Sequence, residues 1–529
     1  MEKRGNNGGF FRHLFFPTTA ANIILPLLAL FFFLVSSGEA DGYRGGTQLD
    51  QAHRHRDHLI RRTSRMMAGA DADGSTPSPS PSPFPSPSPS PSPQISRPGS
   101  RVFHVTDYGA DPTGKVDSTA AIAKAISAAF AATLSDRQLI AGVADLGGAE
   151  VHLDGGAYLV SSPVTLPSQG GGNLKIHSGS LRASGDFPTN RYVIELWSSP
   201  SSAAASSEAR QLNASELLST SGYDYEYVTL RDLLLDSNFR GGGVAVVNSL
   251  RTTIDNCYVV RFVSDGVWVR GGHETMIRGC YLGQHITAGG DPGERRFTGV
   301  GINLMGNDNA VTDTVIFSAD TGILVSGQAN TFSGVHCYNK ATGFGGTGIY
   351  LRLPGNTQTR IVNCYMDYNS IVAEDPVQLV VSGSFFLGDG NVVLKSVKGV
   401  ARDVSIVDNI FSGSGKGVPN VALDETGGAR FADVDAVVVE RNGVSGMARR
   451  STSGRGVARG EGATVWSVDF SSVLLFPDRI DHVQYTLLPE SGFPNHVLRN
   501  VSANQVVVET DVPVKATVHV TVYQMGQLS

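Results

Sequence analysis

The sequence predicts an all-β fold, a parallel β-helix with an N-terminal capping helix and a small C-terminal antiparallel β unit. Short residue pairs recur at steps of 21 to 36 residues, a period typical of stacked supersecondary units. The segments around them are rich in Val, Ile, Thr and Tyr and are broken by Gly, Asn and Asp, as β-strands are. Residues 228–415 contain no long helical pattern, so we expect a coil of strands.

The N-terminal 100 residues are expected to lie outside the fold. Basic residues precede an apolar run at residues 23–35, and small residues end at Ala40, which predicts a cleaved signal peptide over residues 1–40; an uncleaved anchor is the alternative. Pro and Ser alternate over residues 77–93, so residues 41–100 are expected to form an extended, polar linker. Sequons at Asn213 and Asn500 fit a secreted glycoprotein.

The β-helix domain is expected over residues 101–449. Residues 102–110 predict a strand and a turn, and Asp117 and Ser118 are N-cap candidates for a helix over residues 120–132. A solenoid needs a cap on its open end, and this helix suits that role. Strands are expected at residues 150–153 and 158–160, a surface loop at 198–222 and the regular coil at 226–447.

Eight residue pairs define the repeat. They are Leu233-Leu234, Cys257-Tyr258, Cys280-Tyr281, Ile316-Phe317, Cys337-Tyr338, Cys364-Tyr365, Phe385-Phe386 and Ile410-Phe411. All four cysteines fall in one slot of this alignment, so Cys257 is expected to lie over Cys280, and Cys337 over Cys364. The slot is expected to face inward, where free thiols behave as small apolar groups. Disulfides between neighbouring turns remain the alternative.

A C-terminal β unit is expected over residues 450–529. Residues 450–462 are rich in Gly, Ser and Arg, which is typical of a connection. The strands that follow are expected to pair in antiparallel fashion and to cover the C-terminal end of the coil. They are expected at residues 464–470, 482–488, 505–510 and 514–523.

The net charge and the absence of known motifs in the sequence exclude several classes of function. The net charge of −6 at pH 7 gives no basic footprint, so no nucleic-acid partner is expected. The sequence contains no P-loop, no zinc-ligand spacing and no nucleophile elbow. We therefore expect neither a metal nor a cofactor.

The opening of the predicted domain resembles the pectin-lyase-like superfamily. Residues 105–110, Val-Thr-Asp-Tyr-Gly-Ala, are similar to the segment that precedes the capping helix in that superfamily. Residues 235–243 and 272–291 are similar to the plant quartet-type polygalacturonases, pectin-degrading enzymes linked to separation of pollen tetrads. The resemblance covers residues 100–525. It implies a right-handed β-helix, a secreted cell-wall protein and a homogalacturonan substrate.

The chain departs from the polygalacturonase signature, which places Asn-Thr-Asp, Asp-Asp, Gly-His-Gly and Arg-Ile-Lys on successive turns. Val263-Ser264-Asp265-Gly266 is a near match to the first motif. The coil has no Asp-Asp pair and no Arg-Ile-Lys, and Gly271-Gly272-His273 differs from Gly-His-Gly. The resemblance alone therefore does not assign the catalytic residues.

Glycoside hydrolysis needs two carboxyl groups, which inverting enzymes hold about 6.5–9.5 Å apart. Asp265 and Asp320 precede strands of similar sequence that are two rungs apart, so they are expected to lie roughly 10 Å from each other. The long insertion between them supplies the other candidates. Asp291 is a third catalytic acid, and His285, Glu294, Arg295 and Arg296 are substrate-binding residues. Each acid, taken alone, also fits an ordinary turn residue.

These observations predict a secreted, monomeric polygalacturonase that hydrolyses α-1,4-galacturonosyl bonds of pectin in plant cell walls, with inversion and without stable membrane association after signal cleavage. One alternative is a pectate or uronate lyase on the same fold, with Arg295 or Arg296 as the base. Another is a pectin-binding wall protein without catalytic acids. Asp367, Glu374 and Asp375 form a second candidate group of acids.

Overall fold

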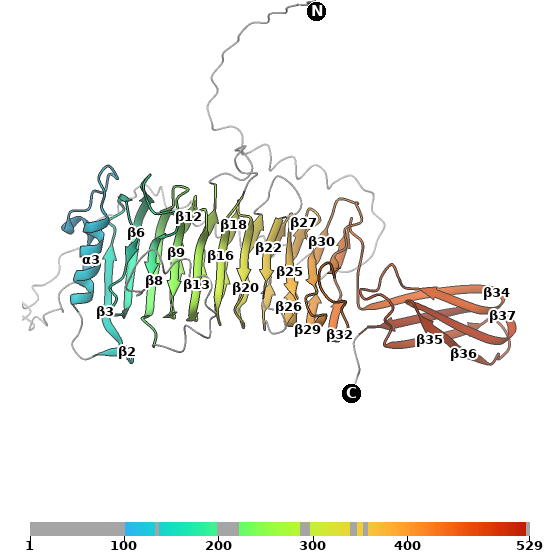
Figure 1. Ribbon diagram of the computed structural model, residues 1–529. Helices are drawn as coiled ribbons and strands as arrows, with labels where there is room; N and C mark the ends of the chain where they lie inside the picture. The colour runs from blue at the N-terminus through green and yellow to red at the C-terminus, as the bar shows by residue number, and fades with distance from the viewer. Residues whose placement is uncertain are drawn as a thin grey trace, which may run out of the picture. The chain divides into compact units, whose positions relative to one another are not determined.

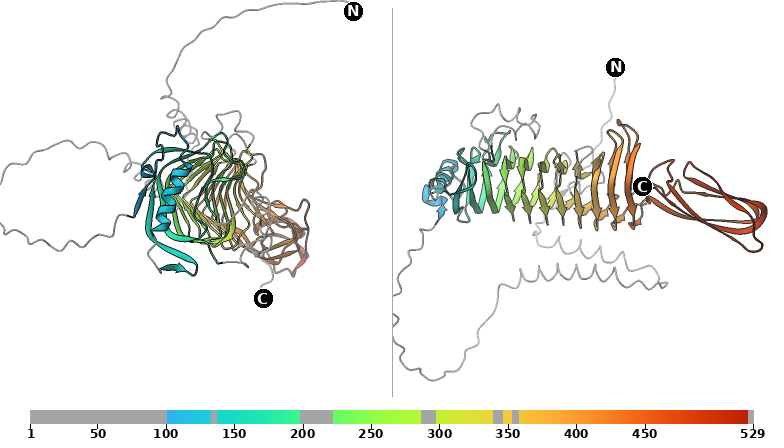
Figure 2. Two further views of the ribbon diagram at one scale, coloured as in Figure 1. Left: turned by 60° about the vertical axis from the view of Figure 1, so that its left-hand side comes forward. Right: turned by 90° about the horizontal axis from the view of Figure 1, so that it is seen from below.

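The computed structural model describes residues 101–132, 137–197, 222–285, 297–338, 346–352 and 358–524. In these residues, parallel strands wind into one long coil, and an antiparallel sheet follows in the chain. The strands stand side by side along the coil in Figure 1, and the views in Figure 2 show the same stacking. The predicted parallel β-helix and antiparallel unit are confirmed.

Several predicted features lie outside the described residues. These are the signal peptide (1–40), the linker (41–100), nearly all of the loop expected at 198–222, and Asn213. Asn500 is described, and it is exposed on a strand of the C-terminal sheet. Among the described residues, no helix is both long and apolar enough to cross a membrane.

Each turn of the coil adds strands to three columns, in which a strand pairs in parallel with its counterpart on the next turn. Column 1 comprises β1 (Val102–His104), β3 (Val143–His152), the first parts of β6 (Gly171–Ala183) and β8 (Tyr225–Asp236), β11 (Thr253–Asp255), β14 (Met276–Arg278), β17 (Ala310–Thr312), β20 (Thr331–Ser333), β23 (Arg360–Val362), β26 (Val377–Ser382), β29 (Val400–Val407) and β32 (Asp433–Glu440).

Columns 2 and 3 complete each turn. Column 2 comprises β4 (Ala157–Val160), the last parts of β6 and β8, β12 (Tyr258–Val260), β15 (Tyr281–Gly283), β18 (Val315–Phe317), β21 (His336–Tyr338), β24 (Tyr365–Asp367), β27 (Phe385–Leu387), β30 (Ile410–Ser412) and β33 (Gly443–Ser445). Column 3 comprises β5 (Val164–Thr165), β7 (Tyr192–Leu196), β9 (Gly242–Val247), β13 (Asp265–His273), β16 (Val300–Asn307), β19 (Thr321–Val325), β22 (Gly346–Leu351), β25 (Asn369–Glu374), β28 (Val392–Lys395) and β31 (Val421–Asp424). The short strands β2 (Gln138–Ile140) and β10 (Ser249–Leu250) lie beside the columns.

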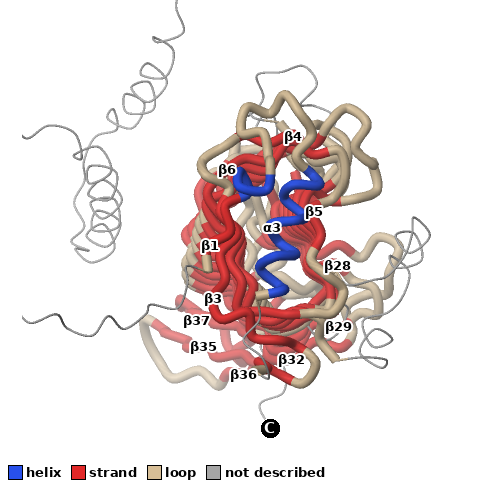
Figure 3. The backbone as a smooth tube through the Cα atoms, turned by 90° about the vertical axis from the view of Figure 1, so that its left-hand side faces the viewer, coloured by secondary structure: helices blue, strands red, loops and turns tan. Residues whose placement is uncertain are grey.

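The capping helix forms as predicted. A short 3-10 helix, η1 (Val105–Tyr108), leads to α3 (Thr119–Ala131), whose buried face includes Ile122 and Ile126. Asp117 accepts hydrogen bonds from the backbone N–H and the hydroxyl of Thr119, at 3.1 and 2.6 Å. This carboxylate caps the helix, although Ser118 occupies the N-cap position. Figure 3 shows α3 lying across the N-terminal opening of the coil.

The observed register corrects the alignment of the residue pairs. Tyr258 pairs with Tyr281, as expected, but Tyr281 pairs with Val315, two residues before Phe317. A separate shift of two residues places Cys337 beside Met366, and the prediction that it lies over Cys364 is wrong. A shift of two residues preserves the face of a strand, which explains why the burial prediction still holds. All four cysteines are buried and free.

The C-terminal sheet contains β34 (Ser453–Asp469), β35 (His482–Pro489), β36 (His496–Ser502) and β37 (Gln505–Tyr523). Residues 450–462, expected to be a connection, are largely strand. Their glycines pack under an aromatic ring, because a Cβ on Gly454 would lie 2.8 Å from Phe470. The two last predicted strands are one continuous strand, which pairs with β34, β35 and β36. Between β34 and β35, Leu475 and Phe476 are buried in the core of the coil.

Candidate active site

The two described candidate acids, Asp265 and Asp320, lie where the chain passes from a strand of column 2 to a strand of column 3. We call the described turn residues 236–241, 261–264, 284–285, 297–299 and 318–320 the turn edge. The insertion found in the sequence comes between β15 and β16 in the chain. Asp291, Glu294, Arg295 and Arg296 fall in that insertion and lie outside the described residues.

Asp265 is the first residue of β13 and directly follows the turn edge. Its side chain is buried, at 8% exposure. The hydroxyl of Tyr192 donates to Oδ2 at 2.6 Å, and the side-chain amide of Asn303 donates to Oδ1 at 3.1 Å. Donors to both oxygens fix the orientation of the carboxyl group.

Aromatic side chains surround Asp265 on the outer face of column 3. The ring of Tyr192 stacks on Trp268 with centroids 5.7 Å apart, and Trp197 meets Trp268 edge-on at 6.4 Å. The guanidinium of Arg270 lies 5.9 Å from the Trp268 ring and is almost fully buried, which lowers the pKa of Arg270. An arginine remains charged in such a setting, so these buried side chains combine aromatic rings with a fixed positive charge.

Glycines allow close packing of the strands beneath Asp265. Gly266, Gly301 and Gly322 occupy equivalent positions on β13, β16 and β19. A Cβ on Gly266 would lie 2.6 Å from the carbonyl oxygen of Gly301, and a Cβ on Gly301 would lie 2.6 Å from that of Gly322. Side chains at these positions would push successive turns apart and displace the neighbouring acids.

Asp320 lies two turns further along the coil than Asp265, and its side chain is exposed. Its backbone N–H donates to the carbonyl oxygen of Gly299 at 2.9 Å. The expected separation of two rungs is correct, because β16 lies between β13 and β19. The expected equivalence of position is wrong, since Asp265 aligns with Val300 and Thr321, which places Asp320 one residue earlier. The glycines of the two strands, Gly266 and Gly322, do align. Asp265 directly precedes its glycine, whereas Thr321 separates Asp320 from Gly322.

His285 is the one predicted substrate-binding residue that the structure describes. Its ring lies between those of Phe239 and Phe297, with centroid distances of 5.3 and 6.2 Å. All three residues belong to turns of the turn edge. The imidazole is thus held among aromatic rings at the base of the insertion.

A charged group near the turn edge was missed in the sequence. Asp236 is 6% exposed and lies 3.6 Å from both Arg182 and Arg261, measured between carboxylate oxygen and guanidinium nitrogen. The backbone N–H of Asn238 donates to the same carboxylate at 2.9 Å. Arg182 and Asp236 are paired neighbours on β6 and β8, so a correct alignment of these rungs would have revealed the group.

The second group of acids has structural partners. Glu374 accepts a hydrogen bond from Tyr350 at 2.6 Å and pairs with Lys395 at 3.1 Å. Asp375 accepts backbone hydrogen bonds from the four residues 397–400. Burial raises the pKa of Asp367, which lies on β24. The network around Glu374 and Asp375 indicates that these two acids stabilise turns of the coil.

Aromatic residues line the outer face of column 2, which leads into the turn edge. This aromatic stripe comprises Tyr258, Tyr281, Phe317, Tyr338, Tyr365 and Phe385. Phe317 stacks on Tyr338 at 5.8 Å, while Tyr281 and Phe385 are 52% and 42% exposed. A shallow hollow lined by Gly179, Asn256 and Tyr258 lies along it. Exposed aromatic side chains that follow one another along a stripe are typical of a binding face.

Comparisons with known proteins identify relatives of the chain. Residues 102–345 match the family model described as rhamnogalacturonase A/epimerase, pectate lyase-like. Polygalacturonase QRT3 of Arabidopsis thaliana is 61% identical over 430 residues, which are 81% of this chain and 85% of that protein.

Solved structures resemble the chain at lower identity. ORF18 of Geobacillus virus E2 has a TM-score of 0.48 at 14% identity, covering 90% of this chain and 82% of that one. The A-module of the mannuronan C-5 epimerase AlgE6 of Azotobacter vinelandii has a TM-score of 0.39 at 15% identity, with 65% and 95% covered. Endo-xylogalacturonan hydrolase of Aspergillus tubingensis has a TM-score of 0.37 at 12% identity, with 65% and 92% covered.

Proposed function

The chain belongs to the family of the Arabidopsis polygalacturonase QRT3, and on that premise we propose that it hydrolyses the α-1,4-galacturonosyl bonds of pectin. The identity of 61% over most of both chains is the observation that carries this proposal. The buried and oriented carboxyl group of Asp265 at the turn edge supports it, because glycoside hydrolysis requires such a group.

We propose an inverting reaction at the turn edge. A carboxylic acid protonates the oxygen of the leaving sugar, while a carboxylate takes a proton from the water that attacks the anomeric carbon from the opposite face. Asp265 is the proposed carboxylate, because hydrogen bonds to both of its oxygens hold it in one orientation. Asp320 or Asp291 is the proposed acid. A two-rung separation of roughly 10 Å between the backbones of Asp265 and Asp320 leaves space for water.

Substrate recognition is proposed to combine charge with stacking. Arg182 and Arg261 near the turn edge, together with Arg295, Arg296 and Glu294 of the insertion, would contact the uronic acid units. Guanidinium groups bind carboxylates through paired hydrogen bonds. His285 and the aromatic stripe would pack against the C–H faces of the sugar rings. An aromatic stripe that runs over several turns of the coil suits a polymer.

The proposed location is the plant cell wall. The predicted signal peptide, the Pro/Ser-rich linker and the exposed sequon at Asn500 support secretion. A monomer without stable membrane association is proposed for the mature protein. Its partner is then the wall polymer itself, homogalacturonan.

Digestion of de-esterified polygalacturonate by the purified protein tests the proposal. We expect new reducing ends, no ultraviolet-absorbing unsaturated products, and activity that survives a chelator. Unsaturated products would reassign the protein as a lyase. Binding of the polymer without cleavage, by protein shown to be folded, would make it a pectin-binding wall protein.

A further inference from the structure

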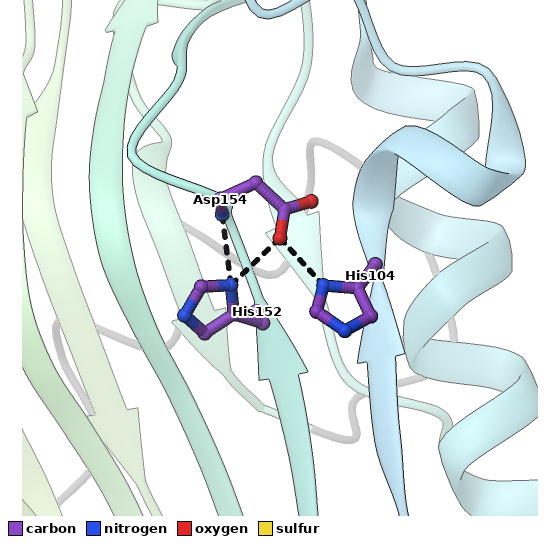
Figure 4. Close-up of side chains that lie close together, drawn as sticks. All are labelled: His104, His152 and Asp154. Carbon is purple, nitrogen blue, oxygen red and sulfur yellow. Dashed lines mark hydrogen bonds and ion pairs between the residues drawn. The ribbon is translucent and has the colours of Figure 1, made fainter.

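Three potential metal ligands converge at the N-terminal end of column 1, as Figure 4 shows. His104 Nδ1 lies 2.5 Å, and His152 Nδ1 lies 2.8 Å, from the same oxygen, Oδ1 of Asp154. The ligand atoms of the three residues all lie within 4.8 Å of one another. His104 and His152 are paired neighbours on β1 and β3, and Asp154 belongs to the turn after β3.

Two hydrogen-bond acceptors of this cluster, His152 Nδ1 and Asp154 Oδ1, face each other. The backbone N–H of Asp154 donates to His152 Nδ1 at 3.1 Å, so this nitrogen presents its lone pair within the cluster. The same nitrogen lies beside the carboxylate oxygen. Two acceptors this close need a cation between them, either a proton on an imidazole or a metal ion.

A neighbouring hydroxyl group orients the carboxylate of Asp154. The hydroxyl of Thr106 donates to Oδ2 at 2.8 Å and leaves Oδ1 facing both rings. Such support fixes the orientation of a metal-binding carboxylate.

Neighbouring residues hold the second imidazole in place. The ring of His177 on β6 meets that of His152 edge-on, with centroids 4.7 Å apart. His177 Nε2 lies 3.0 Å from Glu150, which also pairs with Lys175 at 2.9 Å. Glu150 thus already has two partners, His177 and Lys175, and is not one of the proposed ligands.

We propose that His104, His152 and Asp154 bind one zinc ion through the two Nδ1 atoms and Oδ1. Imidazole nitrogens favour zinc and similar transition metals over calcium and magnesium, which prefer oxygen. The side chains are 45%, 29% and 23% exposed, which leaves room for a water molecule as the fourth ligand. The ion would link β1 to β3 and so stabilise the first turn of the coil. This site is independent of the proposed hydrolysis at the turn edge.

Calorimetric titration of the full chain with ZnCl2 tests the site. His53, His55 and His58 lie in a separate His/Arg-rich stretch, so all variants carry Gln at these positions to remove competing ligands. We expect one zinc ion per chain and a rise of several degrees in the unfolding temperature, because a ligand that binds the native state stabilises it. Cobalt, used in place of zinc, should give the visible absorption of a histidine-bound ion.

His104→Gln, His152→Gln and Asp154→Asn should each weaken zinc binding at least tenfold and abolish the thermal shift. His273→Gln is the matched control, since His273 pairs with Asp308 at 3.1 Å on the same coil without a second histidine. It should leave binding unchanged. Circular dichroism without metal shows whether each variant folds. The proposal is overturned if the parent protein binds no zinc at micromolar concentration, or if folded His104→Gln and His152→Gln variants retain stoichiometric binding.

Discussion

At the residue scale, the proposed chemistry depends most on the carboxyl group of Asp265. Asp265→Asn keeps the size of the side chain but cannot accept the proton of the attacking water, so polygalacturonate cleavage should fall by at least about two orders of magnitude. Tyr192→Phe removes the donor 2.6 Å from Oδ2 and should lower the rate less, by about tenfold. Initial rates of reducing-end release measure both effects.

Asp408→Asn is the control for these variants. Asp408 is an exposed acid that pairs with Arg441 at 2.9 Å, away from the turn edge. Its loss should leave the rate unchanged. A near-normal rate for Asp265→Asn, with the same control result, would place the catalytic acids elsewhere.

His336 should make stability depend on pH. Its ring lies between Tyr338 and Tyr365, with centroids 4.9 and 4.5 Å away, and burial lowers its pKa to about 4. The unfolded chain takes up a proton near pH 6.5, whereas the native protein resists until about pH 4. The unfolded state therefore binds more protons between these values, and stability falls as pH falls through that window.

His336→Phe should remove this part of the pH dependence, which amounts to about 2–3 kcal/mol at pH 4. Chemical denaturation of both proteins at pH 4 and pH 7 measures it. The exposed His482 serves as the control, and His482→Phe should keep the parental pH dependence. An equal change in stability between pH 4 and pH 7 for the parent and His336→Phe would show that folding does not lower the pKa of His336.

At the element scale, the glycines at the start of column 3 set the spacing of the turns. Gly301→Ala would place a Cβ 2.6 Å from the carbonyl oxygen of Gly322, and backbone must move to accept it. The free energy of unfolding should fall by about 1–3 kcal/mol. Gly185→Ala, where a Cβ meets nothing within 4 Å, should change stability little. Similar denaturation midpoints for both variants would contradict the close packing described here.

The elements show why the register was harder to predict than the fold. Strand composition and the helix pattern at residues 120–132 predicted the coil and α3, because these signals are local. The pairs at Tyr258 and Tyr281 aligned correctly, since no insertion separates them. Across the insertion, Tyr281 was matched two residues out of step, since it pairs with Val315. A second match was also wrong by two residues although both pairs read Cys-Tyr, since Cys337 lies beside Met366. Alternating strands conceal such errors, because a shift of two residues keeps the same face.

At the scale of the whole molecule, the sequence predicted the regular parts of the chain better than the site. The parallel coil, its cap and the antiparallel unit followed from periodicity. The surroundings of Asp265 did not, because Tyr192 and Asn303 come from other turns and carry no local signal. Asp236 with Arg182 and Arg261 was missed for the same reason. The strand over residues 450–462 was missed because its glycines pack under Phe470, which only the fold brings there.

The central claim is that this β-helix hydrolyses polygalacturonate by an inverting reaction that depends on Asp265. Proton nuclear magnetic resonance of a digest, recorded in the first minutes, tests it most directly by identifying the anomer released before mutarotation. The account predicts that the α-linked polymer first yields the β-anomer of the new reducing end, and that Asp265→Asn yields almost none. Initial release of the α-anomer, signals of an unsaturated product, or equal yields from Asp265→Asn would contradict it.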